Sequence, residues 1–395
     1  MPCYRAIVIN LAGGVFVVKI ACLSLAMIAC SAAQLSALEH VVFKRDGKQH
    51  DVAGKLLVTA ADGGLLLLAP DGVLWTIQPD EIVDRSRDDE AFVPLGPDEL
   101  AKQLLAQLPA GFETHKTAHY LICHNTSRAY ASWCGALFER LHRGFVNFWT
   151  RKGMKLSEPQ FPLVAIVFAN RESYLEYSQT ELGASSAAII GYYSLRSNQM
   201  TMYDLTGVDA LRKAGDRRAS AAHINQMLAR PEAEQLVATI IHEATHQIAF
   251  NCGMHARFAD IPLWVSEGIA VYFETPDLES AKGWRSIGAI NRSRLTQFRQ
   301  YLPQRSAGSL KSLISDDRRM RDPKLALDAY AEAWALNYYL IRQKPKQYVR
   351  YLQMLAEKKP LVWDDPATRV EEFESAFGEL SALDGDFLRQ MEKVR

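Results

Sequence analysis

Long apolar runs, an excess of charge of one sign and internal repeats are all missing from the main body of this sequence. Beyond the N-terminal region, no stretch reaches the roughly 20 apolar residues that a membrane-spanning helix needs. The 45 lysine and arginine residues equal the 45 aspartate and glutamate residues, which argues against a nucleic-acid-binding protein built on a broad basic surface. We therefore expect the bulk of the chain to be soluble and to have no nucleic-acid partner.

Cysteines are too few for a disulfide scaffold. Of the six in the chain, three lie within the first 30 residues, which leaves Cys123, Cys134 and Cys252. No pair has the C-x-x-C spacing of a structural zinc site. Cys123 and Cys134 are candidates for a bridge between a strand and the helix that follows it, and buried free thiols are the alternative.

The remaining composition is that of a folded globular protein. The 395 residues are 48% hydrophobic and 10% aromatic, which excludes a mainly disordered chain. This length suggests about two or three domains.

The N-terminal region has the pattern of a secretory signal peptide. Basic residues precede the apolar segment 20–29, and the small residues 31–33 follow it. We therefore expect residues 1–33 to be a signal peptide and the protein to be exported, to the periplasm, the cell surface or the medium. A buried helix or an uncleaved anchor is the alternative. The Met-Ile-Ala-Cys sequence that ends at Cys30 also resembles a bacterial lipoprotein cleavage box, in which case Cys30 would carry a lipid tether to a membrane.

Residues 39–85 predict a small antiparallel β module. Short apolar segments at Lys55–Thr59, Leu65–Leu68 and Val73–Ile77 alternate with Asp-Gly turns. The charged, proline-containing residues 86–97 are expected to form a linker.

Strand-like and helix-like segments alternate through residues 98–345, which predicts a domain with a mixed sheet. Four short segments are expected to be strands: residues 119–124, 163–168, 189–194 and 200–205. Asn125 or Thr126 is expected to cap the helix after the first strand, and Asn170 the helix after the second. Nearly everything from residue 231 onward has helical periodicity, and residues 346–395 are expected to be a C-terminal helical extension. The expected fold class is α+β.

One helical segment carries the sequence His242-Glu243-Ala-Thr-His246. In a helix, residues four apart project from the same face, so both imidazoles can bind a single metal ion. Glu243 lies about 100° around the helix, where it can reach a water on that metal without being a ligand. The alternative is a chance match, which the apolar frame of the helix disfavours.

A catalytic zinc site needs a third protein ligand, and His255, Asp260 and Glu267 are the candidates. Twenty residues separate His246 from Glu267, enough for the first helix to end and for a second, beginning near Pro262, to return beside it. We favour Glu267, whose alternative role is that of an ordinary glutamate near a helix start. His255 is expected to be a solvated loop residue.

These motifs resemble a known family. The segment His242–Gln247, followed by Trp264-x-x-Glu267-Gly268-x-Ala270, is similar to the gluzincin branch of zinc metallopeptidases. More narrowly, residues from about 119 to 340 resemble an uncharacterised peptidase-MA-like family of bacterial exported proteins. The metal motif is specific to the superfamily, and the flanking similarities at residues 190–193 and 330–336 are weaker. The small residues Gly268 and Ala270 are expected to let the second helix approach the first.

The resemblance implies a zincin-like peptidase domain that holds Zn²⁺ through His242, His246 and Glu267. It implies hydrolysis of peptide bonds in peptide or protein substrates by a zinc-activated water, with Glu243 as the general base. Tyr330 would donate a hydrogen bond to the developing oxyanion. Its alternative role is packing within an aromatic helix.

The resemblance also implies that the strand at residues 200–205 is the sheet edge along which an extended substrate pairs. The sequence departs from the family pattern in one respect. Some gluzincins have an acid four residues after the ligand glutamate, and this chain has Val271 there. A partner for a metal-binding histidine must therefore come from elsewhere.

Two other functions stay open from the sequence. The protein could be a binding or scaffold protein in which the β module acts and the metal site is vestigial, although the intact Glu243 favours an enzyme. It could also be a zinc amidase that acts on cell-wall material. No oligomeric state is predicted.

Overall fold

The computed structural model describes residues 37–183, 189–206, 221–228, 231–275 and 287–395. The expected signal peptide, residues 1–33, lies outside the described residues. The described chain divides into two compact units, of which the first ends at Leu95 and the second begins at Gly96. No helix within these described ranges is both long enough and apolar enough to cross a membrane.

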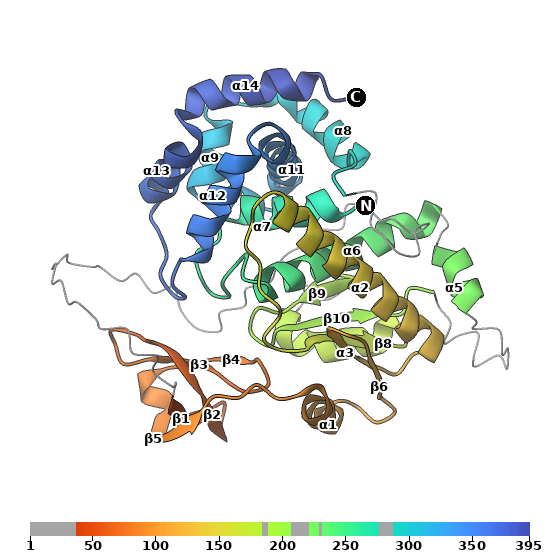
Figure 1. Cartoon of the computed structure of the whole chain (residues 1–395), viewed down its shortest axis with the longest axis vertical. Coiled ribbons are helices and arrows are strands. Elements are labelled where there is room, and N and C mark those ends of the chain that lie inside the picture. Colours follow the sequence, from red (N-terminus) through yellow and green to blue (C-terminus); the bar gives the residue numbers. More distant parts are fainter. Residues whose placement is uncertain (1–36, 184–188, 207–220, 229–230, 276–286) are drawn as a thin grey trace. The chain divides into compact units, whose positions relative to one another are not determined.

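The first unit is an antiparallel sheet, as expected for the β module (Figure 1). Its strands lie in the order β4-β3-β2-β1-β5. The bounds are β1 (Ala37–Arg45), β2 (Lys48–Thr59), β3 (Leu65–Leu68), β4 (Leu74–Ile77) and β5 (Ile82–Ala91), with a short 3₁₀ helix, η1 (Pro79–Glu81), before β5. A small core holds the sheet together and is formed by Val41, Phe43, Leu65, Leu67 and Ile77.

Residues 86–91 are not a linker, because they form the second half of β5. This strand pairs with β1 as far as Ala91. Its charges are those of an exposed edge strand, and Arg85 forms an ion pair with the buried Glu39 of β1, with 2.8 Å between Nε and Oε2. A charged, apolar-poor sequence is therefore compatible with a strand at an edge.

The second unit contains a mixed sheet with the strand order β6-β7-β8-β10-β9. The bounds are β6 (Glu113–Lys116), β7 (Tyr120–His124), β8 (Leu163–Phe168), β9 (Gly191–Tyr193) and β10 (Gln199–Tyr203). Strands β7, β8 and β10 are parallel, whereas β6 and β9 are antiparallel to their neighbours. This is the α+β fold class expected from the sequence.

The expected sheet edge is wrong. The strand predicted at residues 200–205 is β10, which lies between β8 and β9. The edge is β9, because the hairpin turn, where Asn198 has φ 62°, folds β9 back along the far side of β10. Sequence order places β9 before β10 but does not show on which side it pairs.

Helices cover both faces of this sheet. They are α1 (Pro97–Gln107), α2 (Arg128–Arg151), α3 (Arg171–Leu182) and α6 (Pro231–Asn251), and a further helix, α5 (Ala221–Leu228), packs on α2 and α6. Along β8, Leu163, Ala165 and Val167 share a core with α2 and α6. The ring of Phe168, whose side chain points to the opposite face, packs on Tyr174 and Tyr177 of α3. Both faces are therefore buried, which explains why β8 is apolar throughout.

The helix caps are partly as expected. Asn170 caps α3, since its side chain accepts a hydrogen bond from the Ser173 N–H. Ser127 caps α2 in place of Asn125 or Thr126. The side chain of Asn125 instead accepts a hydrogen bond from the backbone of Ala169, at 2.6 Å.

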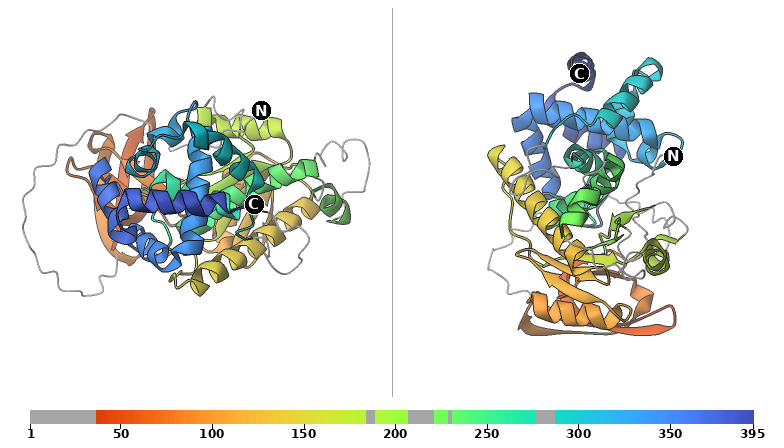
Figure 2. Two further views of the ribbon diagram at one scale, coloured as in Figure 1. Left: turned by 90° about the horizontal axis from the view of Figure 1, so that it is seen from above. Right: turned by 90° about the vertical axis from the view of Figure 1, so that its right-hand side faces the viewer.

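The remaining helices form a second layer (Figure 2). They are α7 (Leu263–Phe273), α8 (Arg292–Tyr301), η3 (Leu302–Gln304), α9 (Ser309–Ser315), α10 (Arg318–Arg321), α11 (Ala326–Gln343), α12 (Pro345–Ala356), α13 (Pro366–Phe377) and α14 (Leu380–Glu392). The expected C-terminal extension belongs to the same compact unit as the mixed sheet. Every residue of α7 is buried, so α7 is a central helix of this unit.

We expected Gly268 to let α7 pack closely on α6, but Gly268 faces α11 instead. A side chain at Gly268 would overlap the amide of Asn337 in α11, and this amide donates hydrogen bonds of 2.8 Å to the carbonyls of Trp264 and Ala333. Gly268 therefore allows α11 to pack closely on α7.

Cys123, Cys134 and Cys252 are buried free thiols. The bridge between Cys123 and Cys134 is absent, and the alternative of free thiols is the one observed.

Candidate metal centre

Helix α6 presents the two histidines of the motif toward the interior. The side-chain amide of Gln247, one residue after His246, donates to the carbonyls of Val164 (2.9 Å) and Asn198 (3.1 Å). These bonds fix the rotation of α6 against the sheet. His242 and His246 are each 1% exposed, and their Nε2 atoms lie 3.0 Å apart.

Glu267 reaches both imidazoles from α7. Its Oε2 lies 3.2 Å from Nε2 of His242 and its Oε1 lies 3.5 Å from Nε2 of His246. Oε1 has no hydrogen-bond partner among the described residues. The three side chains offer ligand atoms within 4.8 Å of one another, and His242, His246 and Glu267 could therefore hold a metal ion, as expected.

Glu274 supports His242 from the opposite side and was not predicted. Its Oε1 accepts a hydrogen bond from Nδ1 of His242 at 2.6 Å, while Asn291 donates to its Oε2 at 3.4 Å. Because Nδ1 carries the proton, Nε2 of His242 can direct a lone pair toward the other two ligands. A signal existed in the sequence, since Glu274 follows Glu267 by seven residues, or about two helical turns.

The charges around this cluster favour a cation between the three side chains. Burial alone would lower the pKa of His242, but hydrogen bonds with Glu267 and Glu274 raise this pKa to about 9. Burial would raise the pKa of Glu267, but the neighbouring imidazoles hold it well below its ordinary value. A buried carboxylate facing two imidazole nitrogens is stable when a proton or a metal cation lies between them. Two nitrogen donors and one oxygen donor form a ligand set that suits zinc.

Glu243 lies against the sheet edge. Its Oε2 accepts a hydrogen bond from the backbone N–H of Tyr193 in β9, at 3.0 Å. The N–H of Tyr193 therefore points toward α6 and away from β10. Glu243 is 7% exposed. It does not belong to the group of side chains whose ligand atoms lie within 4.8 Å of one another.

Tyr330 of α11 lies beside the same cluster. Burial, and then the negative charge of Glu267, raise the pKa of Tyr330 well above its ordinary value. The guanidinium of Arg294 lies over its ring, 5.6 Å from the centroid. The structure therefore brings Tyr330 near the candidate ligands although 62 residues separate it from Glu267.

The other two candidate ligands have different roles. His255 is buried, against the expectation of a solvated loop residue, and packs on Phe250 with ring centroids 5.2 Å apart. Burial lowers the pKa of His255 to about 3. Asp260 forms a buried ion pair with Arg369 of α13 (Oδ2 to Nε, 3.0 Å), and the same guanidinium bonds Asp317. Asp260 thus joins the C-terminal helices to the segment before α7.

A comparison with known protein families finds a match that contains this centre. Residues 236–362 match a family described as "Protein of unknown function (DUF1570)". The matched segment includes the candidate metal ligands and Tyr330. It covers less than one third of the chain, and no curated protein matches the sequence.

Proposed function

We propose that this protein is a zinc-dependent metallopeptidase of the gluzincin type that hydrolyses peptide bonds. The observation that carries the proposal is the convergence of His242, His246 and Glu267, from two helices, with Glu243 directed toward the edge strand of the sheet. A purely structural metal site would have no use for this additional carboxylate.

Zinc is the metal we propose for this centre. When bound, it supplies a Lewis acid that polarises the scissile carbonyl and acidifies a water molecule. The protein's part is to hold the three ligands, and Glu274 fixes the tautomer of His242. Glu274 therefore replaces the acid that is absent at Val271.

Glu243 is the proposed general base. Its carboxylate takes the proton from the attacking water and passes it to the leaving amine. The hydrogen bond from the Tyr193 N–H orients this carboxylate without neutralising it. Glu243 would therefore both transfer the proton and contact β9, the proposed substrate-binding edge.

Tyr330 is the proposed oxyanion donor. A tyrosine hydroxyl is protonated near neutral pH, and the raised pKa of Tyr330 favours this form further. The protonated hydroxyl can donate a hydrogen bond to the developing negative charge.

An extended substrate is proposed to pair along β9, which replaces β10 as the edge. Strand β9 has a neighbour on one side only within the described sheet, and the α6 site adjoins it through Tyr193. Alternate residues of a strand direct their backbone groups to the same side, so Gly191 faces outward together with Tyr193.

Export remains part of the proposal because of the N-terminal pattern. We expect the mature protein to begin between Cys30 and Glu39 when the exported form is sequenced from its N-terminus. A mature protein that retains Met1 would contradict a cleaved signal peptide.

Glu243→Gln tests the mechanism. The amide cannot accept the water proton, so cleavage should fall by at least ~10²–10⁴-fold, while zinc content and the thermal melt stay near wild type. Glu176→Gln, at an exposed glutamate of α3, is the matched control and should cleave normally. Peptide libraries and cell-wall fragments are both assayed. Cleavage of wall amides alone would favour the amidase, and a zinc-loaded wild type that cleaves neither would favour the scaffold.

A further inference from the structure

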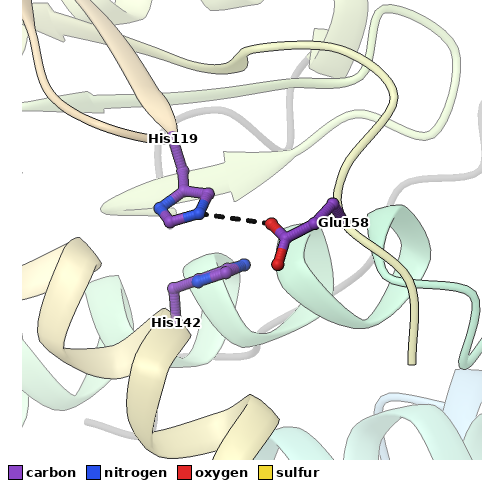
Figure 3. Close-up of side chains that lie close together, drawn as sticks. All are labelled: His119, His142 and Glu158. Atoms are coloured by element: carbon purple, nitrogen blue, oxygen red, sulfur yellow. Dashed lines mark ion pairs between the residues drawn. The ribbon is translucent and has the colours of Figure 1, made fainter. Parts of the chain in front are cut away.

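A second cluster of metal-ligand side chains lies on the mixed-sheet unit and shares no residue with the α6 centre. His119 precedes β7, His142 lies on α2, and Glu158 follows α2 in the segment before β8 (Figure 3). The three side chains offer ligand atoms within 4.8 Å of one another. Nε2 of His119 lies 3.3 Å from Oε2 of Glu158.

The two imidazole rings stack one over the other, and both point toward the carboxylate of Glu158 (Figure 3). Their centroids are 4.0 Å apart, and the ring planes are 29° from parallel. His119 and His142 therefore present ring edges to one point in space, next to Glu158. This is the arrangement that a shared cation requires.

His142 supplies an independent sign that a ligand is expected. It is 5% exposed, and its Nε2 is buried without a hydrogen-bond partner among the described residues. A buried polar atom without a partner is unfavourable, and natural structures have few of them.

His119 is oriented as metal-binding histidines usually are. Its Nδ1–H donates to Oε2 of Glu139 at 2.8 Å, which leaves Nε2 free to act as the ligand atom. Glu139 is itself held by the hydroxyl of Thr117 and by the backbone N–H of His119, each at 2.7 Å. A carboxylate that fixes the tautomer and orientation of a ligand histidine in this way is a common feature of metal sites.

We propose that His119, His142 and Glu158 form a second metal site, which binds a divalent transition-metal ion such as Zn²⁺. Two imidazoles and one carboxylate favour such an ion over Ca²⁺ or Mg²⁺, which prefer sets of oxygen ligands. Glu158 is 80% exposed, so water completes the coordination. Because Glu158 follows α2 and His119 precedes β7, a bound ion would tie the segment after α2 to the start of β7.

Zinc stoichiometry tests this site separately from the α6 centre. Untagged full-length protein is dialysed against a zinc buffer, and bound zinc is measured by mass spectrometry. The wild type should hold two zinc ions per chain, and His246→Ala should hold one. His142→Gln should also hold one, and the combined variant should hold none.

Glu158→Gln covers the case in which His142→Gln does not fold, because Glu158 is exposed. In the His246→Ala background it should weaken the remaining zinc site at least tenfold, whereas Glu176→Gln should leave it unchanged. A wild type with one zinc that His246→Ala abolishes would overturn the second site. Two zinc ions that persist in both His142→Gln and Glu158→Gln would overturn it as well. Failure of the α6 centre would instead appear as one zinc that His246→Ala retains and His142→Gln loses.

Discussion

Replacing Glu274 by glutamine is the substitution that the structure makes most informative. Glu274 is 6% exposed, and its carboxylate accepts the Nδ1–H of His242 at 2.6 Å. Glutamine has nearly the same shape and can still accept this hydrogen bond, but it lacks the negative charge. The change therefore removes the electrostatic part of the support for His242 and leaves the packing largely intact.

The expected loss is one of metal affinity. Removing a side chain that hydrogen-bonds a metal-binding histidine weakens metal binding by about 10–100-fold. This loss corresponds to about 1.4–2.7 kcal/mol. A second effect appears in the metal-free protein. Glu274 helps to raise the pKa of His242 to about 9, so this pKa should fall in the variant and the metal should meet less competition from a proton. The affinity loss should consequently be largest well above pH 9, where wild-type His242 is already neutral.

The assay is competition with a fluorescent zinc chelator at several pH values, together with NMR titration of His242 in the metal-free protein. Both are carried out in the His142→Gln background, so that the proposed second site does not contribute. Glu176→Gln is the control. An affinity for zinc within twofold of the parent protein, combined with an unchanged pKa of His242, would refute the role assigned to Glu274.

Three further predictions follow from the surroundings of the centre. Tyr330→Phe keeps the ring and removes the hydroxyl. We expect kcat to fall by about 10²–10³-fold, with KM little changed and zinc retained. A normal kcat would exclude Tyr330 as the oxyanion donor. Arg369→Met leaves the buried Asp260 without its ion-pair partner. The free energy of unfolding, measured by urea titration, should therefore fall by about 3–5 kcal/mol, while zinc content stays unchanged. Loss of zinc would instead return Asp260 to the candidate ligands. His255, with a pKa lowered to about 3, takes up a proton in the unfolded chain before the folded one does. Stability should therefore decrease as the pH falls from 6.5 toward 3, by on the order of 4 kcal/mol, and His255→Phe should flatten this decrease in metal-free thermal melts; an unchanged slope would contradict the burial of a neutral ring.

Local patterns in the sequence determined the elements that carry the centre. The H-E-x-x-H spacing placed two imidazoles on one face of α6, because a helix repeats every 3.6 residues regardless of what surrounds it. Leu163–Phe168 is a strand with the predicted bounds, since an apolar segment of that length between turn residues has few other conformations. Glu267 followed from the same reasoning once a second helix was expected to return beside the first.

Only the tertiary structure decided which side chains meet across separate elements. The partner of His242 is Glu274, which reaches it from the end of α7. His255 is buried and packs on Phe250 of α6, although it lies in the turn that follows this helix. Strand β9 is the edge because it pairs outside β10. The ring of His119, just before β7, stacks on that of His142 in α2 because of how this helix packs on the sheet. Backbone conformation depends mostly on neighbours in sequence, whereas these contacts depend on how strands and helices pack, and the spacing of residues along one chain does not specify that packing.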